Sequence, residues 1–198
     1  MEDALEQLDT LAARVRACTR CQDLVECRTR AVPGKGHPHT RVMVVTWCPD
    51  EADEAGDGPA GAGSVARLAA YLPALTGPAR NELYLTGLIK CVPRSGETVR
   101  APRPDEQEHC FEYLSREISI TTPHWILTVG EETSRFLLRK LFRDLPHREG
   151  ESLELRVFDN PAFKVVPVAT PEELDGREPR AQKAYRDRLR ALAQRMGI

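Results

Sequence analysis

Four of the six cysteines are spaced in a way that constrains the fold more than any other feature of the sequence. Cys18 and Cys21 form a CxxC pair, whereas Cys91 ends the run that begins at Tyr84, and Cys110 lies inside a helical pattern. Four thiolates placed in this way can surround one metal centre only if the fold brings both ends of this long segment together. The cysteines therefore predict a site and a chain path at the same time.

The spacing also bears on which metal centre these thiolates would bind. Soft thiolate ligands select zinc or an iron-sulfur cluster. Structural zinc sites usually use two close pairs, but here 69 residues separate Cys21 from Cys91, and 18 separate Cys91 from Cys110. This favours a cluster held across a finished fold, with zinc and unligated thiols as the alternatives. Cys27 and Cys48 are expected to be buried thiols rather than nucleophiles.

Length and hydropathy place the chain among ordinary globular proteins. A chain of 198 residues favours a single domain, over 1–198. No charged and apolar leader is present, and no apolar run approaches the roughly 18 residues that cross a bilayer. We therefore expect a cytoplasmic monomer without membrane association. In that reducing compartment cysteines indicate metal ligation or burial before disulfides.

Short apolar runs alternate with amphipathic segments along the chain. Strands are expected over 41–46, 83–89, 125–129, 153–158 and 163–168. Helices are expected over 5–15, 64–71, 131–142 and 179–196, and a further helix should begin at Pro104 and carry Cys110. The acidic, glycine-rich stretch after Pro49 is expected to be a loop. This alternation is typical of an α/β fold with a parallel, helix-flanked sheet, whose ligand site lies at the carboxyl ends of the strands.

The glycines and the charges add two restrictions. Gly56, Gly58 and Gly61 fit the pattern GxGxxG, but Gly56 comes too long after the preceding strand and Pro59 interrupts the turn, so no nucleotide cofactor is expected. The formal net charge of -2 does not favour a nucleic-acid partner. Residues 14–41 and the segment from Arg177 onward are nevertheless locally basic, while 50–57 are acidic, and each cluster is first interpreted as solvated surface.

Motifs around the four cysteines resemble those of a known family. The residues concerned are Cys18, Cys21, Leu24 and Arg28 in CxxCxLxxxR, Lys90, Cys91 and Pro93 in KCxP, Pro104 and Glu106 before Cys110, Val129 and Gly130 at a strand end, and Thr170, Pro171 and Leu174. From about Leu11 to the C-terminus, the chain resembles the family 4, iron-sulfur uracil-DNA glycosylases. The resemblance implies a 4Fe-4S cluster bound by Cys18, Cys21, Cys91 and Cys110, within elements at 11–28 and 90–110. It also implies a central four-stranded, mainly parallel sheet flanked by helices, and DNA as the partner.

The base pocket implied by the resemblance departs from the family. Only Pro49 is shared in the first active-site motif, where Trp47 replaces an acidic residue. Ala60 stands where the family stacks a phenylalanine on uracil, Gly87 where an asparagine reads the base, and Thr170 where a histidine lies. Glycosidic cleavage needs negative charge near the sugar and a donor near the departing base. Ordinary uracil excision is therefore expected to be weak or absent.

Three interpretations of this pocket stay open. In the first, it excises another flipped, modified base: Trp47 supplies the aromatic ring, Gly87 opens volume, and Asp50 or Asp53 supplies the catalytic carboxylate. In the second, Trp47 fills the pocket, and the protein binds DNA or a protein partner without cutting. The third holds that the fold serves protein interaction alone. We take excision of a non-uracil base as the leading enzymatic hypothesis.

DNA contacts are expected from basic loops and one apolar residue. The candidates are Lys35 and His37 in a Gly/Pro loop, Arg94, Arg100 and Arg103 in the insertion between Cys91 and Cys110, and Leu174, where the family inserts a leucine wedge into DNA. Acidic residues on either side of Leu174 would repel phosphate, which favours the interpretation without cutting.

Overall fold

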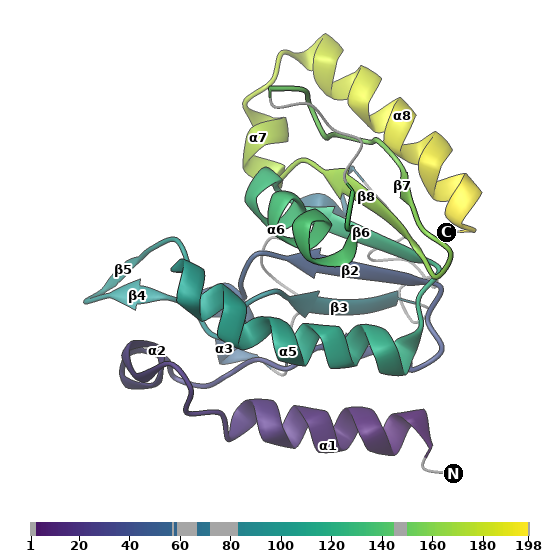
Figure 1. Ribbon diagram of the computed structural model, residues 1–198. Coiled ribbons are helices and arrows are strands. Elements are labelled where there is room, and N and C mark those ends of the chain that lie inside the picture. The colour runs from purple at the N-terminus through teal and green to yellow at the C-terminus, as the bar shows by residue number, and fades with distance from the viewer. Residues whose placement is uncertain (1–2, 57, 59–66, 72–82, 145–149, 198) are drawn as a thin grey trace.

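A six-stranded mixed sheet forms the centre of the structure, with helices on both of its faces (Figure 1). The computed structural model describes residues 3–56, 58, 67–71, 83–144 and 150–197. In sheet order the strands are β1 (Lys35–Gly36), β3 (Leu83–Gly87), β2 (Val42–Thr46), β6 (Trp125–Val129), β8 (Lys164–Val168) and β7 (Phe158–Asp159). A separate small hairpin pairs β4 (Arg94–Ser95) with β5 (Thr98–Val99).

The four inner strands run parallel to one another. Val42 of β2 lies opposite Leu83 on one side and Trp125 on the other, and Trp125 in turn lies opposite Lys164. Each inner strand has five residues that are nearly all buried, as in parallel sheets that are covered on both faces. The two-residue strands β1 and β7 pair antiparallel at the edges. The expected four-stranded parallel sheet is therefore the centre of a mixed sheet.

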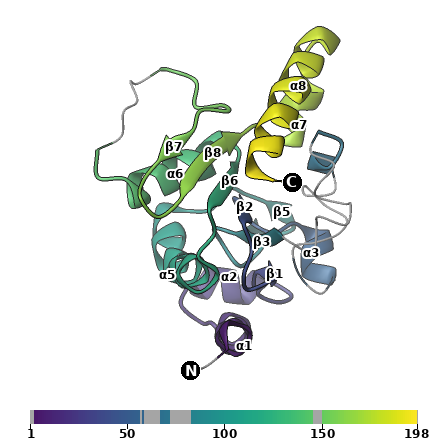
Figure 2. The same ribbon diagram turned by 90° about the vertical axis from the view of Figure 1, so that its right-hand side faces the viewer.

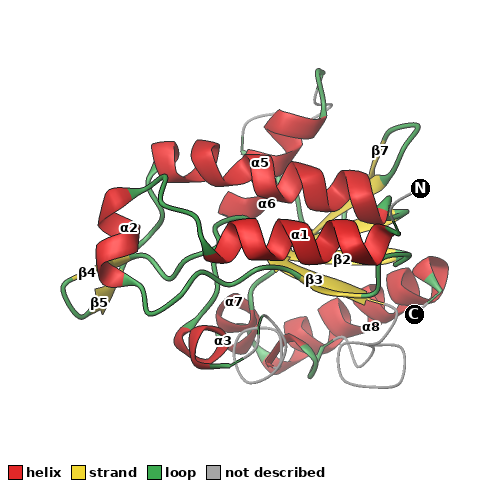
Figure 3. Cartoon of the chain, turned by 90° about the horizontal axis from the view of Figure 1, so that it is seen from below, coloured by secondary structure: helices red, strands yellow, loops and turns green. Residues whose placement is uncertain are grey.

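Helices cover the two faces of this sheet with separate apolar clusters (Figures 1 and 2). The first cluster contains side chains of α1 (Ala4–Arg16), α5 (Pro104–Thr121) and α6 (Glu131–Leu141), and the second contains side chains of α8 (Pro179–Met196). Met43 and Val45 of β2 belong to the first cluster, whereas Val42 and Val44 belong to the second, as the alternation of side chains along a strand requires. Helix α1 packs along α5 as an outer layer (Figure 3).

Three short helices were not expected from the sequence. They are α2 (Gln22–Cys27), α3 (Glu51–Ala55) and α7 (Pro171–Asp175). The acidic stretch that was expected to be a loop contains α3. Asp50 is the N-cap of this helix, and its side chain accepts a hydrogen bond from the Asp53 backbone N–H. Acidic residues in the first turn of a helix are favoured by the helix dipole. Negative charge here therefore starts a helix instead of preventing one.

One expected strand is wrong, and one expected helix lies partly outside the described residues. Leu155 adopts a positive φ of 56°, which interrupts the extended path over 153–158. Its N–H still donates to the Pro167 carbonyl of β8 at 2.8 Å, but only Phe158 and Asp159 pair with β8 as a strand. The helix expected over 64–71 begins outside the described residues. Among the helices of the described ranges, none combines the length and the apolar character needed to span a bilayer.

Candidate functional site

The carboxyl edge of the parallel sheet brings together segments that are distant in the sequence. β2 ends at Thr46 and β3 ends at Gly87, and the two chains stay paired beyond their last strand residues. The Leu88 N–H donates to the Thr46 carbonyl at 2.8 Å, and the Ile89 N–H donates to the Trp47 carbonyl at 2.9 Å. Trp47 is thereby fixed at the edge where α/β proteins bind their ligands.

Trp47 presents a buried donor at this edge. Its ring packs against the first apolar cluster, and its indole Nε1 is buried without a hydrogen-bond partner among the residues that the structure describes. A buried N–H group that lacks a partner is rare in folded proteins and costs about 1–3 kcal/mol. The indole N–H is therefore an unused donor at the position where the resemblance implies an acidic residue, and protein atoms cover it in this conformation.

Gly87 does not open a space, contrary to the expectation from the sequence. A Cβ built on Gly87 would lie 2.5 Å from the Ile89 carbonyl oxygen and 3.5 Å from backbone atoms of Cys48. Contacts that short exclude any side chain unless the backbone moves. Glycine is required here because two segments of backbone approach each other closely.

The two candidate carboxylates are held by the start of α3. The Asp53 N–H donates to Asp50 Oδ1 at 2.9 Å, and the Asp50 N–H donates to Asp53 Oδ2 at 3.3 Å. Asp53 is buried and also borders a cavity of about 40 Å³ together with Arg30 and Pro33. Burial raises the pKa of Cys48 to about 12, and the charges of the two aspartates act in the same direction. Cys48 is therefore a neutral thiol at physiological pH, as expected.

Thr170 and Leu174 have structural contacts in α7. The Glu173 N–H donates to Thr170 Oγ1 at 3.2 Å, and the Thr170 N–H donates back to Glu173 Oε2 at 2.7 Å, so Thr170 caps the helix. Leu174 is 0% exposed in the second apolar cluster. In this conformation the side chain packs in the core, and its expected role as a wedge in DNA stays a prediction that requires it to leave the core. Ala60 lies outside the described residues.

The four candidate metal-ligating cysteines come from both expected elements. Cys18 follows α1, Cys21 is the N-cap of α2, Cys91 follows β3, and Cys110 lies in α5. Five of the six pairs of these cysteines are close enough for the charge of one to shift the pKa of another. Within the described part of the chain, no three His, Cys, Asp or Glu side chains converge tightly enough to hold a single metal ion. The four cysteines thus lie near one another, and the described residues contain no tight single-ion site.

Donor groups surround these sulfur atoms. Arg28 Nη1 lies 3.0 Å from Cys91 Sγ, the Lys90 N–H lies 3.3 Å from Cys110 Sγ, and His109 Nδ1 lies 3.7 Å from Cys21 Sγ. Burial raises the pKa of Cys21 to about 11 and that of Cys110 to about 12. Without a bound metal these thiols stay protonated, and a metal centre would displace their protons. The donors suit sulfur atoms that carry negative charge once ligated.

The chemistry of the quartet fits an iron-sulfur cluster. In a 4Fe-4S cluster each cysteine binds a different iron atom, so the four sulfur atoms surround a larger centre than one ion. Four thiolates are also the usual donor set of such a cluster. The residues present therefore fit the group that the resemblance implies.

The predicted DNA-contacting residues occupy very different places. Arg94 pairs with Glu54 at 2.7 Å, Arg100 pairs with Glu106 at 2.6 Å, and Arg103 pairs with Asp23. The insertion thus uses its arginines in contacts within the chain, and their role in DNA binding stays a prediction.

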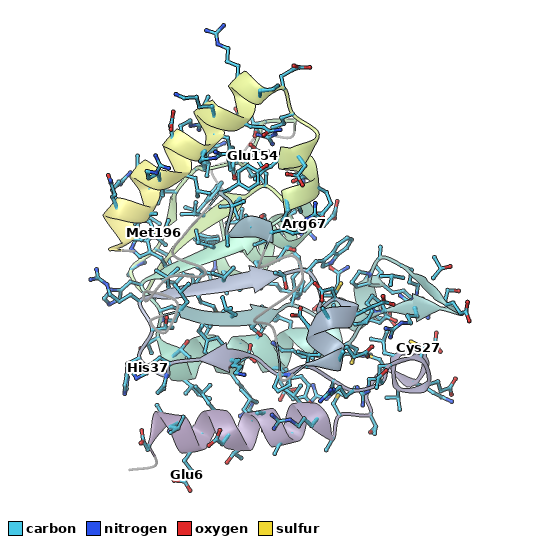
Figure 4. All side chains as sticks on the ribbon, turned by 180° about the vertical axis from the view of Figure 1, so that it is seen from behind. Glu6, Cys27, His37, Arg67, Glu154 and Met196 are labelled. Carbon is cyan, nitrogen blue, oxygen red and sulfur yellow. The ribbon has the colours of Figure 1, made fainter. Side chains whose placement is uncertain are left out.

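His37 lies away from the carboxyl edge of the sheet, whereas Lys35 lies along its side. Lys35 pairs with Leu85 in the middle of β3. Because β1 runs antiparallel, His37 follows it toward the amino edge, and Figure 4 shows His37 at the opposite end of the sheet from Cys27. The structure therefore places His37 near the amino edge of the sheet, and its contact with DNA stays a prediction.

Sequence reasoning missed one buried ion pair beside the site. Lys90 and Glu117 have side chains that are each 1% exposed, and Lys90 Nζ lies 2.7 Å from Glu117 Oε2. Lys90 Nζ also donates to the Gly87 carbonyl at 2.8 Å, while Glu117 accepts the Gly34 N–H at 3.1 Å. The sequence contained a signal for this pair: Lys90 lies in an apolar run directly before Cys91, and Glu117 follows Cys110 by seven residues.

Comparisons with known proteins point to one family. A model of the uracil DNA glycosylase superfamily matches residues 33–193. The type-4 uracil-DNA glycosylase of Saccharolobus solfataricus is 31% identical over 137 residues, which are 69% of this chain and 62% of that protein. Those of Archaeoglobus fulgidus and Thermotoga maritima are each 30% identical over 133 residues, 67% of this chain and 64% and 67% of theirs. The chain thus matches about three fifths of the length of the first two of these relatives.

Proposed function

Because the chain belongs to the uracil-DNA glycosylase superfamily, we propose that it is an iron-sulfur protein that binds DNA and removes a modified, non-uracil base by hydrolysis of the N-glycosidic bond. The base would be read at the carboxyl edge of the sheet. A single domain over 1–198 and a monomeric state remain part of this proposal.

The cluster is assigned to Cys18, Cys21, Cys91 and Cys110. Support comes from the mutual electrostatic influence of these thiols and from the Arg28 and Lys90 donors beside their sulfur atoms. When bound, the cluster would link α1, α2, the end of β3 and α5. Its role here is structural, since it would hold the DNA-facing segments in place.

The observation that carries the proposal is the unpartnered indole N–H of Trp47. A flipped base brings carbonyl oxygens or ring nitrogens that accept such a donor, and its flat face can stack on an aromatic ring. Trp47 is neutral, so it favours recognition by hydrogen bonding over stabilisation of positive charge on the sugar. This distinguishes the edge from that of an enzyme with a carboxylate at the same position.

Excision further needs a carboxylate near the sugar and help for the departing base. We assign the carboxylate to Asp53 or Asp50, whose charges reach the end of β2 at Cys48. Thr170 offers a neutral hydroxyl to the departing base instead of an imidazole. The loss of one electrostatic stabiliser typically lowers the rate about a hundred- to a thousandfold, so uracil excision should be weak.

A second candidate function is recognition of DNA without cleavage. It is favoured by one observation: the aspartates and Thr170 already make the capping contacts that start α3 and α7. Groups that hold helix ends are less available for proton transfer or charge stabilisation. Under this alternative Trp47 would still read the base.

An excision assay separates the two functions. Duplexes that contain uracil, hypoxanthine, alkylated bases or hypermodified bases are incubated with the protein and scored for alkali-labile abasic sites. If the protein is an excision enzyme, it should release one of the modified bases. Asp53→Asn or Asp50→Asn should slow that release at least tenfold. Asparagine keeps the ability to cap, so these variants remove charge and preserve the helix start. Glu51→Gln, on the exposed side of α3, is the matched control and should leave the rate unchanged. Release of no base, together with selective binding, supports the second candidate.

A further inference from the structure

The outer face of α8 carries an excess of positive charge, of which only Arg195 lies in the last turn, where the helix dipole favours it. The helix contains six basic residues, Arg180, Lys183, Arg186, Arg188, Arg190 and Arg195, and one acidic residue, Asp187. Its buried side is apolar and consists of Tyr185, Leu189, Leu192, Ala193 and Met196. Five of the six basic side chains are exposed on the remaining, outward surface of the helix, and Arg186 is half-buried.

Few of these charges are neutralised within the described part of the chain. Lys183 pairs with Asp187, and Arg186 lies over the Tyr71 ring at 5.4 Å. The other four, Arg180, Arg188, Arg190 and Arg195, form no ion pair with any residue that the structure describes. The arginines at the carboxyl edge differ from those of α8, because Arg67, Arg94 and Arg100 are each paired with carboxylates.

Helix stability does not explain the arrangement. Arg186 and Arg190 are four residues apart, a spacing at which like charges destabilise a helix. Arg180 lies in the first turn, where the helix dipole disfavours positive charge. At the other end of the helix, the Arg41 guanidinium comes within 3.3 Å of a Cβ position at Gly197, which extends the positive surface onto the start of β2.

The surface also lacks the anchors that protein partners use. Leu5 and Val99 are the exposed large apolar side chains found among the described residues, and neither belongs to α8. Protein interfaces depend on buried aromatic or aliphatic anchors, whereas nucleic-acid backbones are bound by many arginines and lysines. Residues seven apart, such as Arg188 and Arg195, lie about 10 Å apart along the helix and could reach successive groups of a phosphate backbone.

We propose that the outer face of α8, which comprises Arg180, Arg188, Arg190 and Arg195 with Arg41, binds the phosphate backbone of duplex DNA as a second contact surface. α8 starts beside α7 at the carboxyl edge and ends near the amino edge at Met196 (Figure 4). It packs on the second apolar cluster, whereas Trp47 packs against the first cluster, on the other face of the sheet. The inference takes DNA as the polyanion from the proposed function but does not depend on excision.

The test compares two variants that each lose four positive charges. The first is Arg180→Gln, Arg188→Gln, Arg190→Gln and Arg195→Gln combined. The control combines Arg14→Gln, Arg16→Gln, Arg139→Gln and Arg143→Gln, which changes arginines of α1 and around α6, on the other face of the sheet. Glutamine has a helix propensity close to that of arginine, and far-UV circular dichroism checks that both variants fold.

Binding to an undamaged duplex is measured by fluorescence anisotropy between 50 and 200 mM salt. Each lost phosphate contact reduces the magnitude of the slope of log K against log salt by about 0.9. The magnitude of the slope should therefore fall by about 2 to 4 in the α8 variant and by less than about 1 in the control. Equal slopes for both variants, or no binding of duplex by the unmodified protein, would overturn the inference. A loss of binding to polyglutamate without a loss for DNA would also overturn it, in favour of an acidic protein.

The ratio of affinities for modified and undamaged duplexes keeps this test apart from the proposed function. The α8 variant should lower both affinities equally and leave the ratio unchanged. If the unmodified protein binds modified and undamaged duplexes equally well, base recognition at Trp47 is refuted. The salt slopes would then still test whether the outer face of α8 binds DNA.

Discussion

Removal of the Lys90 ammonium group should destabilise the protein more than any single change at its surface. Lys90 Nζ contacts Glu117 Oε2 at 2.7 Å, the Gly87 carbonyl at 2.8 Å and Thr86 Oγ1 at 2.5 Å. In Lys90→Met the Glu117 carboxylate would stay buried without its partner cation. Breaking a buried ion pair from one side typically costs about 3–5 kcal/mol, because one charge is left uncompensated.

Urea denaturation at equal iron content measures this loss as a change in the free energy of unfolding. Lys183→Met is the matched control, because the Lys183–Asp187 pair is exposed and should contribute about 0.3–0.5 kcal/mol. Lys90→Met combined with Glu117→Gln should lose less than the sum of the two single variants, because the uncompensated charge is then gone. A loss below about 1 kcal/mol in Lys90→Met would refute the reasoning that this pair holds the end of β3 against α5.

Three other changes test neighbouring parts of the structure. Cys91→Ser should lose most of its iron and its visible absorbance and should increase proteolysis of the segment before residue 30; a variant with unchanged iron would contradict the ligand assignment. Because burial raises the Cys48 pKa from 9.0 to about 12, the folded state holds this proton more tightly. The resulting stabilisation is complete below about pH 9 and is lost as the pH rises toward 12, so Cys48→Ala should show a shallower alkaline decline in melting temperature than the unmodified protein, and parallel curves would exclude this contribution. Leu174→Ala should cost about 2–5 kcal/mol of stability and leave DNA affinity unchanged, whereas a selective loss of affinity would restore the wedge hypothesis.

The sequence predicts the central strands well because their apolar composition matches their burial in the fold. The runs 42–46, 83–87 and 125–129 are continuous and apolar, and both faces of each strand are buried in the structure. The amphipathic pattern of α8 likewise predicts its bounds, 179–196. Where the apolar pattern of a segment matches its burial in the fold, the pattern alone is enough to predict the strand or helix.

The candidate site is less predictable because its contacts join distant segments. The pairing of Arg94 with Glu54 depends on how α3 packs against the insertion, and no local pattern indicates it. The close backbone approach at Gly87 likewise depends on the path of the chain after β2. The place of His37 depends in the same way on the direction of β1, which loop composition does not reveal and the sheet pairing gives.

The most direct test of the account compares the two tryptophans of the chain. The affinity ratio between a duplex with the preferred modified base and the same duplex without it is measured for Trp47→Phe and for Trp125→Phe, which changes a buried tryptophan in the second apolar cluster. Loss of one hydrogen bond to a buried partner corresponds to about 1–3 kcal/mol, so Trp47→Phe should lower the ratio about 5- to 150-fold, and Trp125→Phe should leave it unchanged. An equal ratio in Trp47→Phe and in the unmodified protein would contradict the assignment of base recognition to this edge of the sheet.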